Sequence, residues 1–239
     1  GERESLDEIM KQVKALKHTF HTESVDIAEK SISCEKKNEG FTTSGQVQYV
    51  ARTGNFRKKG YEYTGALDIL KVILSYDYLW MNLRVKGGAY GCMSNFNRIG
   101  EGYLISYRDP NLEKRMEIYE GVVDYLENFN VDDRDMNKFI IGTISNIDRP
   151  MNPAAKGSRS MNLYMSRVTE GMIRREREQI LSAESKKISA RLQKILKAVL
   201  DADQICVIGS EEKIERTKRD VHGDQNIKLR SMTEQRKRE

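Results

Sequence analysis

The residues best suited to chemistry are an arginine and a tyrosine on either side of a glycine-rich turn. Arg84 and Tyr90 are six positions apart, and residues 84–91 read R-V-K-G-G-A-Y-G. An arginine can hold a carboxylate or a carbonyl oxygen, and a tyrosine hydroxyl can donate a hydrogen bond. Gly87 and Gly88 give the backbone the freedom that a tight turn needs. The stretch therefore predicts either a substrate-binding loop or a plain turn between two elements.

The other reactive side chains do not form a complete catalytic site. His18 and His21 have a spacing of three that would let them share a metal, but neither H-E-x-x-H nor H-x-x-E-H is present, which favours surface histidines. No cysteine stands beside a histidine as a thiol protease would need. The glycines lack the phosphate-loop pattern and follow a helical stretch, whereas a phosphate loop follows a strand. By its own residues, the chain is not a self-contained enzyme.

Composition excludes several other classes of protein. The net charge of +5 comes from 41 basic and 36 acidic residues spread along the chain, which argues against a nucleic-acid partner. The locally basic segment 224–239 is interpreted as a solvated tail. The three cysteines are far apart, which is typical of reduced thiols in an intracellular protein. No run approaches the ~18 apolar residues of a membrane span, so no membrane partner is expected.

Periodicity supplies the elements that must position Arg84 and Tyr90. Thr64 is the expected N-cap of a long apolar helix that runs to about residue 86, and a β-hairpin over 89–97 and 103–107 follows the glycines. Asp109 is the expected N-cap of the next helix, with Pro110 at its first position. The remaining expected elements are helices over 5–20 (within an N-terminal segment 1–22), 132–147, 155–171, 172–182 and 185–200, strands over 46–51 and 204–209, and a short helix after Ser210. This order favours an α+β fold in one domain over residues 1–239.

Several stretches together resemble one protein family. Residues 84–91 resemble the R-x-x-G-G-A-Y-G signature of the presequence-protease branch of the pitrilysin-type zinc metallopeptidases (inverzincins). The flanks agree in type and order: V-Q-Y-V at 47–50, D-Y-L-W at 77–80, S-Y-R-D-P-N-L at 106–112 and V-I-G-S at 207–210. The resemblance covers residues 40–216.

The resemblance implies a fold, a cofactor and partners. The fold would be an antiparallel sheet with helices packed on one side, as in mitochondrial-processing-peptidase-like and LuxS-like metallohydrolases. The chain would be the C-terminal domain of a metalloendopeptidase that degrades unstructured peptides in a closed chamber. Zinc would be bound by another domain, in the N-terminal half of the same polypeptide, and this chain alone would bind none and be inactive. The implied location is the bacterial cytoplasm, with the mitochondrial matrix as the alternative.

The resemblance also implies roles for the glycine-rich stretch. Tyr90 would donate to the scissile carbonyl oxygen and Arg84 would hold a nearby substrate carbonyl, with Gly87 and Gly88 shaping the substrate-binding turn. The alternative roles are structural: Arg84 as a cation that offsets the helix macrodipole, and Tyr90 as a half-buried strand residue. A non-catalytic peptide-binding or scaffold domain of the same fold, and a basic nucleic-acid binder, are the competing functions.

Overall fold

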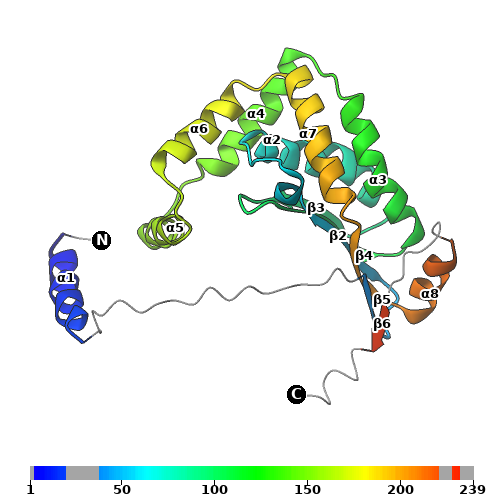
Figure 1. Ribbon diagram of the computed structural model, residues 1–239, viewed down its shortest axis with the longest axis horizontal. Helices are drawn as coiled ribbons and strands as arrows, with labels where there is room; N and C mark the ends of the chain where they lie inside the picture. Colours follow the sequence, from blue (N-terminus) through cyan, green and yellow to red (C-terminus); the bar gives the residue numbers. More distant parts are fainter. Residues whose placement is uncertain (1–2, 20–37, 221–227, 232–239) are drawn as a thin grey trace. The chain divides into compact units, whose positions relative to one another are not determined.

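The computed structural model (Figure 1) describes residues 3–19, 38–220 and 228–231. The chain divides into two compact units. A helical unit spans Gly1–Glu35 and Pro150–Arg167, and a sheet unit spans Lys36–Arg149 and Val168–Glu239. The helical unit holds α1 (Arg3–Lys17) and α5 (Pro153–Met165). That residues 1–239 form a single domain stays a prediction.

The helix α1 is amphipathic, as its sequence predicts. Its large apolar side chains are each about half exposed: Leu6, Ile9, Met10, Val13 and Leu16. The described helix begins two residues earlier and ends three residues earlier than predicted, and residues 20–22 of the N-terminal segment lie outside the described residues.

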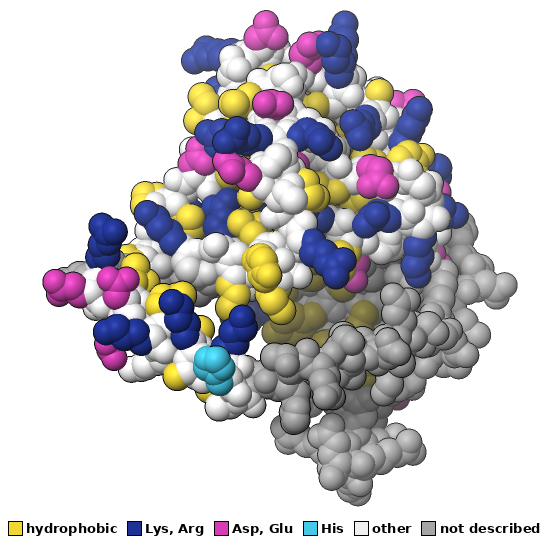
Figure 2. Space-filling view, turned by 60° about the vertical axis from the view of Figure 1, so that its left-hand side comes forward, with side chains coloured by type: hydrophobic (Ala, Val, Ile, Leu, Met, Phe, Trp, Pro, Cys, Tyr) yellow, Lys and Arg dark blue, Asp and Glu magenta, His cyan; other side chains and the backbone are white. Residues whose placement is uncertain are grey.

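Surface charge is mixed. Figure 2 shows basic and acidic side chains interspersed on the displayed face, with no broad area of one sign. Within the described residues, no helix is both long and apolar enough to cross a membrane.

The sheet unit is built on six strands in the order β3-β4-β2-β5-β1-β6. Three neighbouring pairs are antiparallel: β3 (Gly91–Phe96) with β4 (Glu101–Asp109), β4 with β2 (Gln48–Asn55), and β2 with β5 (Gln204–Gly209). The outer strands β1 (Glu39–Thr42) and β6 (Lys228–Ser231) run parallel to β5 and to β1 respectively. The predicted hairpin and central strands are confirmed, and the outer pairs make the sheet mixed.

Helices cover one face of this sheet, as Figure 1 shows for α2, α3 and α7. Along β2, Val50, Arg52 and Gly54 are buried, while the alternate residues Ala51 and Thr53 remain partly exposed. This period of two places the buried series against the helices and leaves the other face open. The predicted α+β class with helices on one side is confirmed.

The long apolar helix leading to the glycines is present, but its second half is wider than an α-helix. It begins as α2 (Ala66–Ile73) and continues with π-helical hydrogen bonding through η2 (Leu74–Tyr78) and η3 (Trp80–Val85). The Lys86 amide, for example, donates to the Met81 carbonyl at 2.9 Å. π-Helical turns inside helices are frequently found at functional sites.

The remaining helices of the sheet unit begin and end close to the predicted residues. They are α3 (Glu113–Glu127), α4 (Asp133–Ile147), α6 (Glu170–Leu181), α7 (Ser185–Leu200) and α8 (Glu211–Asp220). A short 3₁₀ helix, η1 (Phe56–Lys59), follows β2. The Asp132 side chain caps α4 by accepting from the Asp135 amide.

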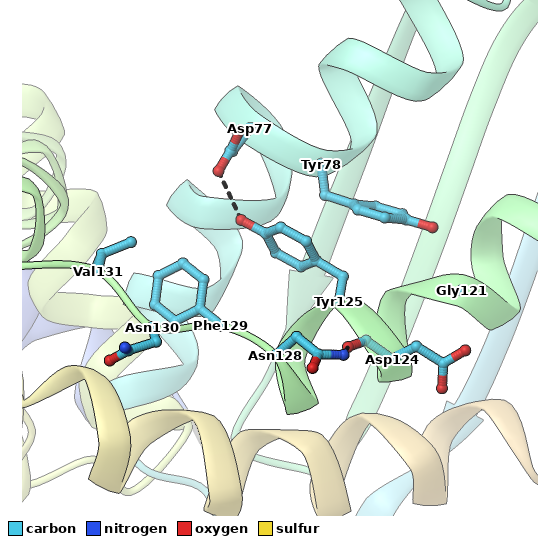
Figure 3. A pocket seen from close by; sticks show the side chains of 9 residues that line it. All are labelled: Asp77, Tyr78, Gly121, Asp124, Tyr125, Asn128, Phe129, Asn130 and Val131. Carbon is cyan, nitrogen blue, oxygen red and sulfur yellow. Dashed lines mark hydrogen bonds between the residues drawn. The ribbon is translucent and has the colours of Figure 1, made fainter.

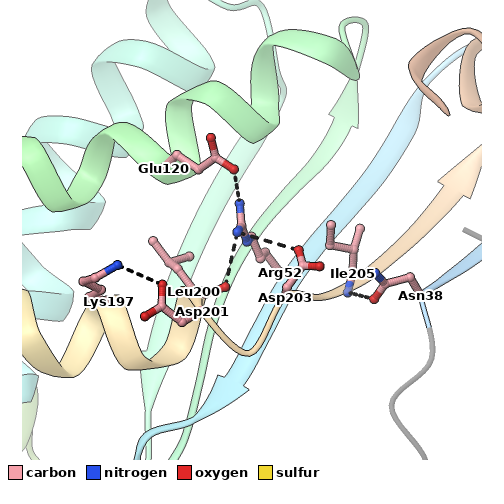
Figure 4. A network of polar contacts seen from close by, with 8 residues as sticks. All are labelled: Asn38, Arg52, Glu120, Lys197, Leu200, Asp201, Asp203 and Ile205. Atoms are coloured by element: carbon pink, nitrogen blue, oxygen red, sulfur yellow. Dashed lines mark hydrogen bonds and ion pairs between the residues drawn. The ribbon is translucent and has the colours of Figure 1, made fainter. Parts of the chain in front are cut away.

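A buried arginine ties the sheet to two helices (Figure 4). Arg52 of β2 pairs with Glu120 of α3 at 2.9 Å and with Asp203 at 3.8 Å. Its guanidinium also donates to the carbonyl of Leu200, the last residue of α7, at 3.2 Å. The Arg52 cation thereby gives a C-terminal carbonyl of α7 a hydrogen-bond partner. It also interacts favourably with the negative end of the α7 dipole.

Two predicted N-caps are wrong. The N-cap of α2 is Gly65, and the Thr64 hydroxyl instead donates to the Gln179 side chain of α6 at 3.0 Å. A β-carbon on Gly65 would lie 2.1 Å from the Glu176 carbonyl oxygen, so α6 approaches too closely for any other residue. Asp109 does not cap α3, which begins at residue 113, because its carboxylate is buried in an ion pair.

Two strands were not predicted. No local pattern indicates β1, and β6 lies inside the basic segment 224–239 that the sequence analysis interprets as a solvated tail. The rest of the basic tail, residues 224–227 and 232–239, lies outside the described residues.

Candidate functional site

The glycine-rich turn closes the C-terminal end of η3 and directs the chain into β3. Gly88 has a φ of 73°, in the left-handed region that glycine adopts most readily. Its amide donates to the Arg84 carbonyl at 3.0 Å, and the Ala89 amide donates to the Leu83 carbonyl at 3.0 Å. These bonds satisfy carbonyls that the helix would otherwise leave without partners.

Arg84 and Tyr90 are both presented to solvent by this turn, each against a different support. The Arg84 guanidinium lies 4.1 Å from the centroid of the Trp80 ring, one turn earlier on η3. Tyr90 is 60% exposed, and its ring centroid lies 5.9 Å from that of Tyr107 on β4. The guanidinium of Arg108 lies 5.2 Å from the Tyr90 ring. Cation–π contact and ring packing thus hold both side chains without burying them.

A buried ion pair beneath the turn fixes its backbone. Arg115 of α3 is 1% exposed and forms an ion pair with the fully buried Asp109 at the end of β4. Arg115 also donates from Nη2 to the Gly87 carbonyl at 2.7 Å. A β-carbon on Gly87 would lie 2.3 Å from Arg115 Nη1, so the guanidinium occupies the space that a side chain at position 87 would need.

The strand after the turn also requires a glycine. A β-carbon on Gly91 would lie 2.3 Å from the Tyr107 hydroxyl oxygen, so the Tyr107 ring crosses the start of β3 at that point. The same Tyr107 ring supports Tyr90. The glycines at 87, 88 and 91 therefore serve the packing and conformation of a loop whose outer side carries Arg84 and Tyr90.

The exposed charges of the turn are positive. Arg84, Lys86 and Arg108 are exposed, while the acidic Asp109 is buried and paired with Arg115. Burial raises the pKa of the Cys92 thiol, although the nearby guanidinium groups of Arg84 and Arg115 favour its thiolate. Such a surface favours ligands with carbonyl or carboxylate oxygens.

These side chains do not suit a metal ion. Zinc in proteins is bound by thiolate, imidazole and carboxylate groups, and the exposed groups here are guanidinium, ammonium and phenol. In the part of the chain that the structure describes, no three His, Cys, Asp or Glu side chains are grouped so as to hold a metal. The residues of this turn therefore do not fit zinc.

The structure brings the four sequence-predicted residues into one turn, and it adds residues that the sequence analysis missed. The most important is Arg115. It falls in the same helical stripe as Leu112 and Tyr119, three and four positions away, so the spacing placed it on the inner side of α3. A buried arginine at that position signals a buried partner, which is Asp109.

Comparison with known proteins gives a family and a fold. The family model described as the PreP C-terminal domain matches residues 38–211. "Protein HypA" of Clostridium perfringens is 42% identical over 218 residues, which are 91% of this chain and 22% of that protein. Presequence protease 1, chloroplastic/mitochondrial, of Arabidopsis thaliana is 37% identical over 180 residues, 75% of this chain and 17% of that protein.

Solved structures share the fold at low sequence identity. A peptidase M16 inactive domain from Pseudomonas fluorescens aligns with a TM-score of 0.58 and 16% identity, covering 88% of this chain and 51% of that one. Pitrilysin aligns with a TM-score of 0.56 and 11% identity, covering 82% of this chain and 22% of that one. The chain thus spans about a fifth of the length of the two curated relatives above.

Proposed function

The chain belongs to the PreP C-terminal domain family, and we propose that it is the zinc-free C-terminal domain of a zinc metalloendopeptidase that degrades unstructured peptides in a closed chamber. The observation that supports this most directly is the turn at 84–91. Its backbone is fixed from beneath by Arg115, while Arg84 and Tyr90 stay exposed above it. A rigid loop that presents two hydrogen-bond donors is suited to holding a peptide.

Each side chain has a distinct role in this proposal. The Tyr90 hydroxyl donates to the scissile carbonyl oxygen as that oxygen gains negative charge, and Arg84 holds a second substrate carbonyl. Removing one donor of this kind typically lowers kcat by about 10²–10³-fold. Gly87 and Gly88 bind substrate only in the sense that they let the backbone lie close to it. The zinc would be held by the N-terminal half of the same polypeptide, outside this chain.

The test uses the protein that carries this chain together with an H-x-x-E-H sequence. Tyr90→Phe removes only the hydroxyl and is expected to lower kcat by about 10²-fold or more on an unstructured peptide. Arg84→Ala is expected to raise KM. The matched control is Tyr76→Phe, because Tyr76 is 69% exposed on η2 and belongs to no part of the turn. Wild-type turnover in both Tyr90→Phe and Arg84→Ala would refute the assignment.

The second candidate is a non-catalytic peptide-binding or scaffold domain. It is favoured by the fold shared with the Pseudomonas fluorescens structure described as an inactive M16 domain. A reading frame that encodes this chain without any H-x-x-E-H sequence, in a protein that still binds peptides, would select this alternative.

The proposed location is the bacterial cytoplasm, with the mitochondrial matrix as the alternative. The relatives above include a protein from a Clostridium species and one named as chloroplastic/mitochondrial. Fractionation followed by immunodetection with an antibody to this chain distinguishes the two.

A further inference from the structure

A pocket lies in the helical layer, between η2 and the end of α3 (Figure 3). Its volume is about 430 Å³, and it is lined by residues 77–78 of η2 and by residues from 121 to 131. Its lining residues are distinct from those of the turn at 84–91. All nine lining residues belong to the described part of the sheet unit, and none of them is basic.

Aromatic rings form one wall of this pocket, and each is held in place. The Tyr78 and Tyr125 ring centroids are 4.9 Å apart, and those of Tyr125 and Phe129 are 5.8 Å apart. The Tyr78 ring reaches over Gly121, where a β-carbon would lie 2.6 Å from its hydroxyl oxygen. The Tyr78 hydroxyl donates to the Ile118 carbonyl at 2.9 Å, which joins η2 to α3. The wall is therefore preformed.

The phenol donors of the pocket are already used within the protein. Besides Tyr78, the Tyr125 hydroxyl donates to Asp77 Oδ2 at 2.7 Å, and the Asn128 amide donates to the Asp124 carbonyl at 2.9 Å. Burial, with the Asp77 charge, raises the pKa of Tyr125, so this phenol keeps its proton. What the pocket offers to a ligand is acceptor oxygens, from the carboxylates of Asp77 and Asp124, and the faces of aromatic rings.

We propose that this pocket binds a guanidinium group. The guanidinium ion is planar, carries five N–H donors and stacks on aromatic faces, so it complements both the carboxylate oxygens and the rings. An anion would meet the carboxylates of Asp77 and Asp124 and no basic side chain among the lining residues, so the pocket favours a cation. The group is supplied either by an arginine side chain of a peptide or by a small free guanidine. This inference is independent of the proposed peptidase activity.

The test is a titration of the 239-residue chain followed by two-dimensional ¹H–¹⁵N NMR. N-acetylarginine amide is expected to bind with a Kd of about 1 mM, which is typical of so small a ligand. The shifts should centre on the amides of Asp77, Tyr78 and residues 128–131. N-acetylcitrulline amide, which has the same shape without the charge, should bind at least about tenfold more weakly. Ethylguanidinium distinguishes the two sources of the guanidinium group. If it binds as tightly as N-acetylarginine amide, the natural ligand is a small free guanidine; if it binds more weakly, the natural ligand is an arginine side chain of a peptide.

Variants separate a charge effect from a folding effect. Asp77→Asn keeps an acceptor for Tyr125 and should weaken binding about fivefold, which corresponds to an ion pair near the surface. The double variant with Asp124→Asn should abolish detectable binding, whereas Glu178→Gln, an exposed acid on α6, should leave it unchanged. Equal affinity for arginine and citrulline amides, or wild-type affinity in a folded double variant, would overturn the proposal.

Discussion

Gly87→Ala tests whether Arg115 fixes the turn that carries Arg84 and Tyr90. In the folded protein the new β-carbon would lie 2.3 Å from Arg115 Nη1 and 2.6 Å from both Arg115 Nη2 and the Leu83 carbonyl oxygen. β-Carbons do not approach other heavy atoms this closely, so either the guanidinium or the backbone must move. The guanidinium is not a free end, because it is buried and paired with Asp109.

The size of the effect follows from which of the two moves. If Arg115 leaves Asp109, a buried ion pair is broken, which costs about 3–5 kcal/mol. If the turn moves instead, the cost is that of an overpacked core, about 1–3 kcal/mol. We therefore expect Gly87→Ala to lower the free energy of unfolding by about 2–4 kcal/mol. In a protein carrying the proposed activity, the moved turn should also lower peptide turnover.

The assay is urea unfolding, with two alanine variants as controls. Gly142→Ala, in the interior of α4, would place its β-carbon 3.6 Å from the nearest atom, and it should be neutral or stabilising by up to about 1 kcal/mol. Gly88→Ala has space but an unfavourable φ of 73°, which costs about 1–2 kcal/mol. A loss below about 1 kcal/mol for Gly87→Ala, with the slope against urea unchanged, would refute the reasoning.

Two further predictions concern stability. Arg52→Met should lower the free energy of unfolding by about 1.5–3 kcal/mol, because it removes charged hydrogen bonds made by a side chain that is 7% exposed. The control, Arg57→Met, removes one member of an exposed ion pair and should change the free energy of unfolding by less than about 1 kcal/mol. Urea unfolding measures both variants, and equal losses would contradict the burial argument. Burial raises the pKa of Asp68 above its ordinary value, so the folded state binds the proton more tightly than the unfolded state. This stabilisation is complete below about pH 4 and is lost as the pH rises through the raised pKa. Asp68→Asn, which keeps an acceptor for the Tyr63 hydroxyl, should flatten this part of the plot of urea midpoint against pH, and an unchanged plot would contradict it.

The elements that could be predicted from the sequence are those with a strong local pattern. The helix over 185–200 and the strand over 204–209 were predicted at their observed bounds, because an unbroken apolar stripe and a short buried run define them. β1 and β6 have four residues each and lie beside strands distant in sequence. No local sequence pattern identifies these two strands, because they form only by pairing with strands that the fold brings beside them.

The candidate site divides in the same way. Arg84 and Tyr90 stood out because they flank glycines, and a glycine cluster is visible in any sequence. Arg115 did not stand out, because an isolated arginine in an amphipathic helix usually faces solvent. Its burial depends on Asp109, which by local rules is a good N-cap. The tertiary ion pair overrode the local preference of both residues.

The order of the strands has a consequence for how the sheet assembles. The hairpin β3–β4 pairs Phe96 with Gly102, so its ends meet early and at little entropic cost. Farther across the sheet, the Ile205 amide of β5 donates to the side chain of Asn38, just before β1, across 167 positions of sequence. Contacts between residues this far apart form slowly, because most of the chain must be ordered before they stabilise anything. We therefore expect the sheet to grow from the hairpin that follows Tyr90, with β1 and then β6 joining it late.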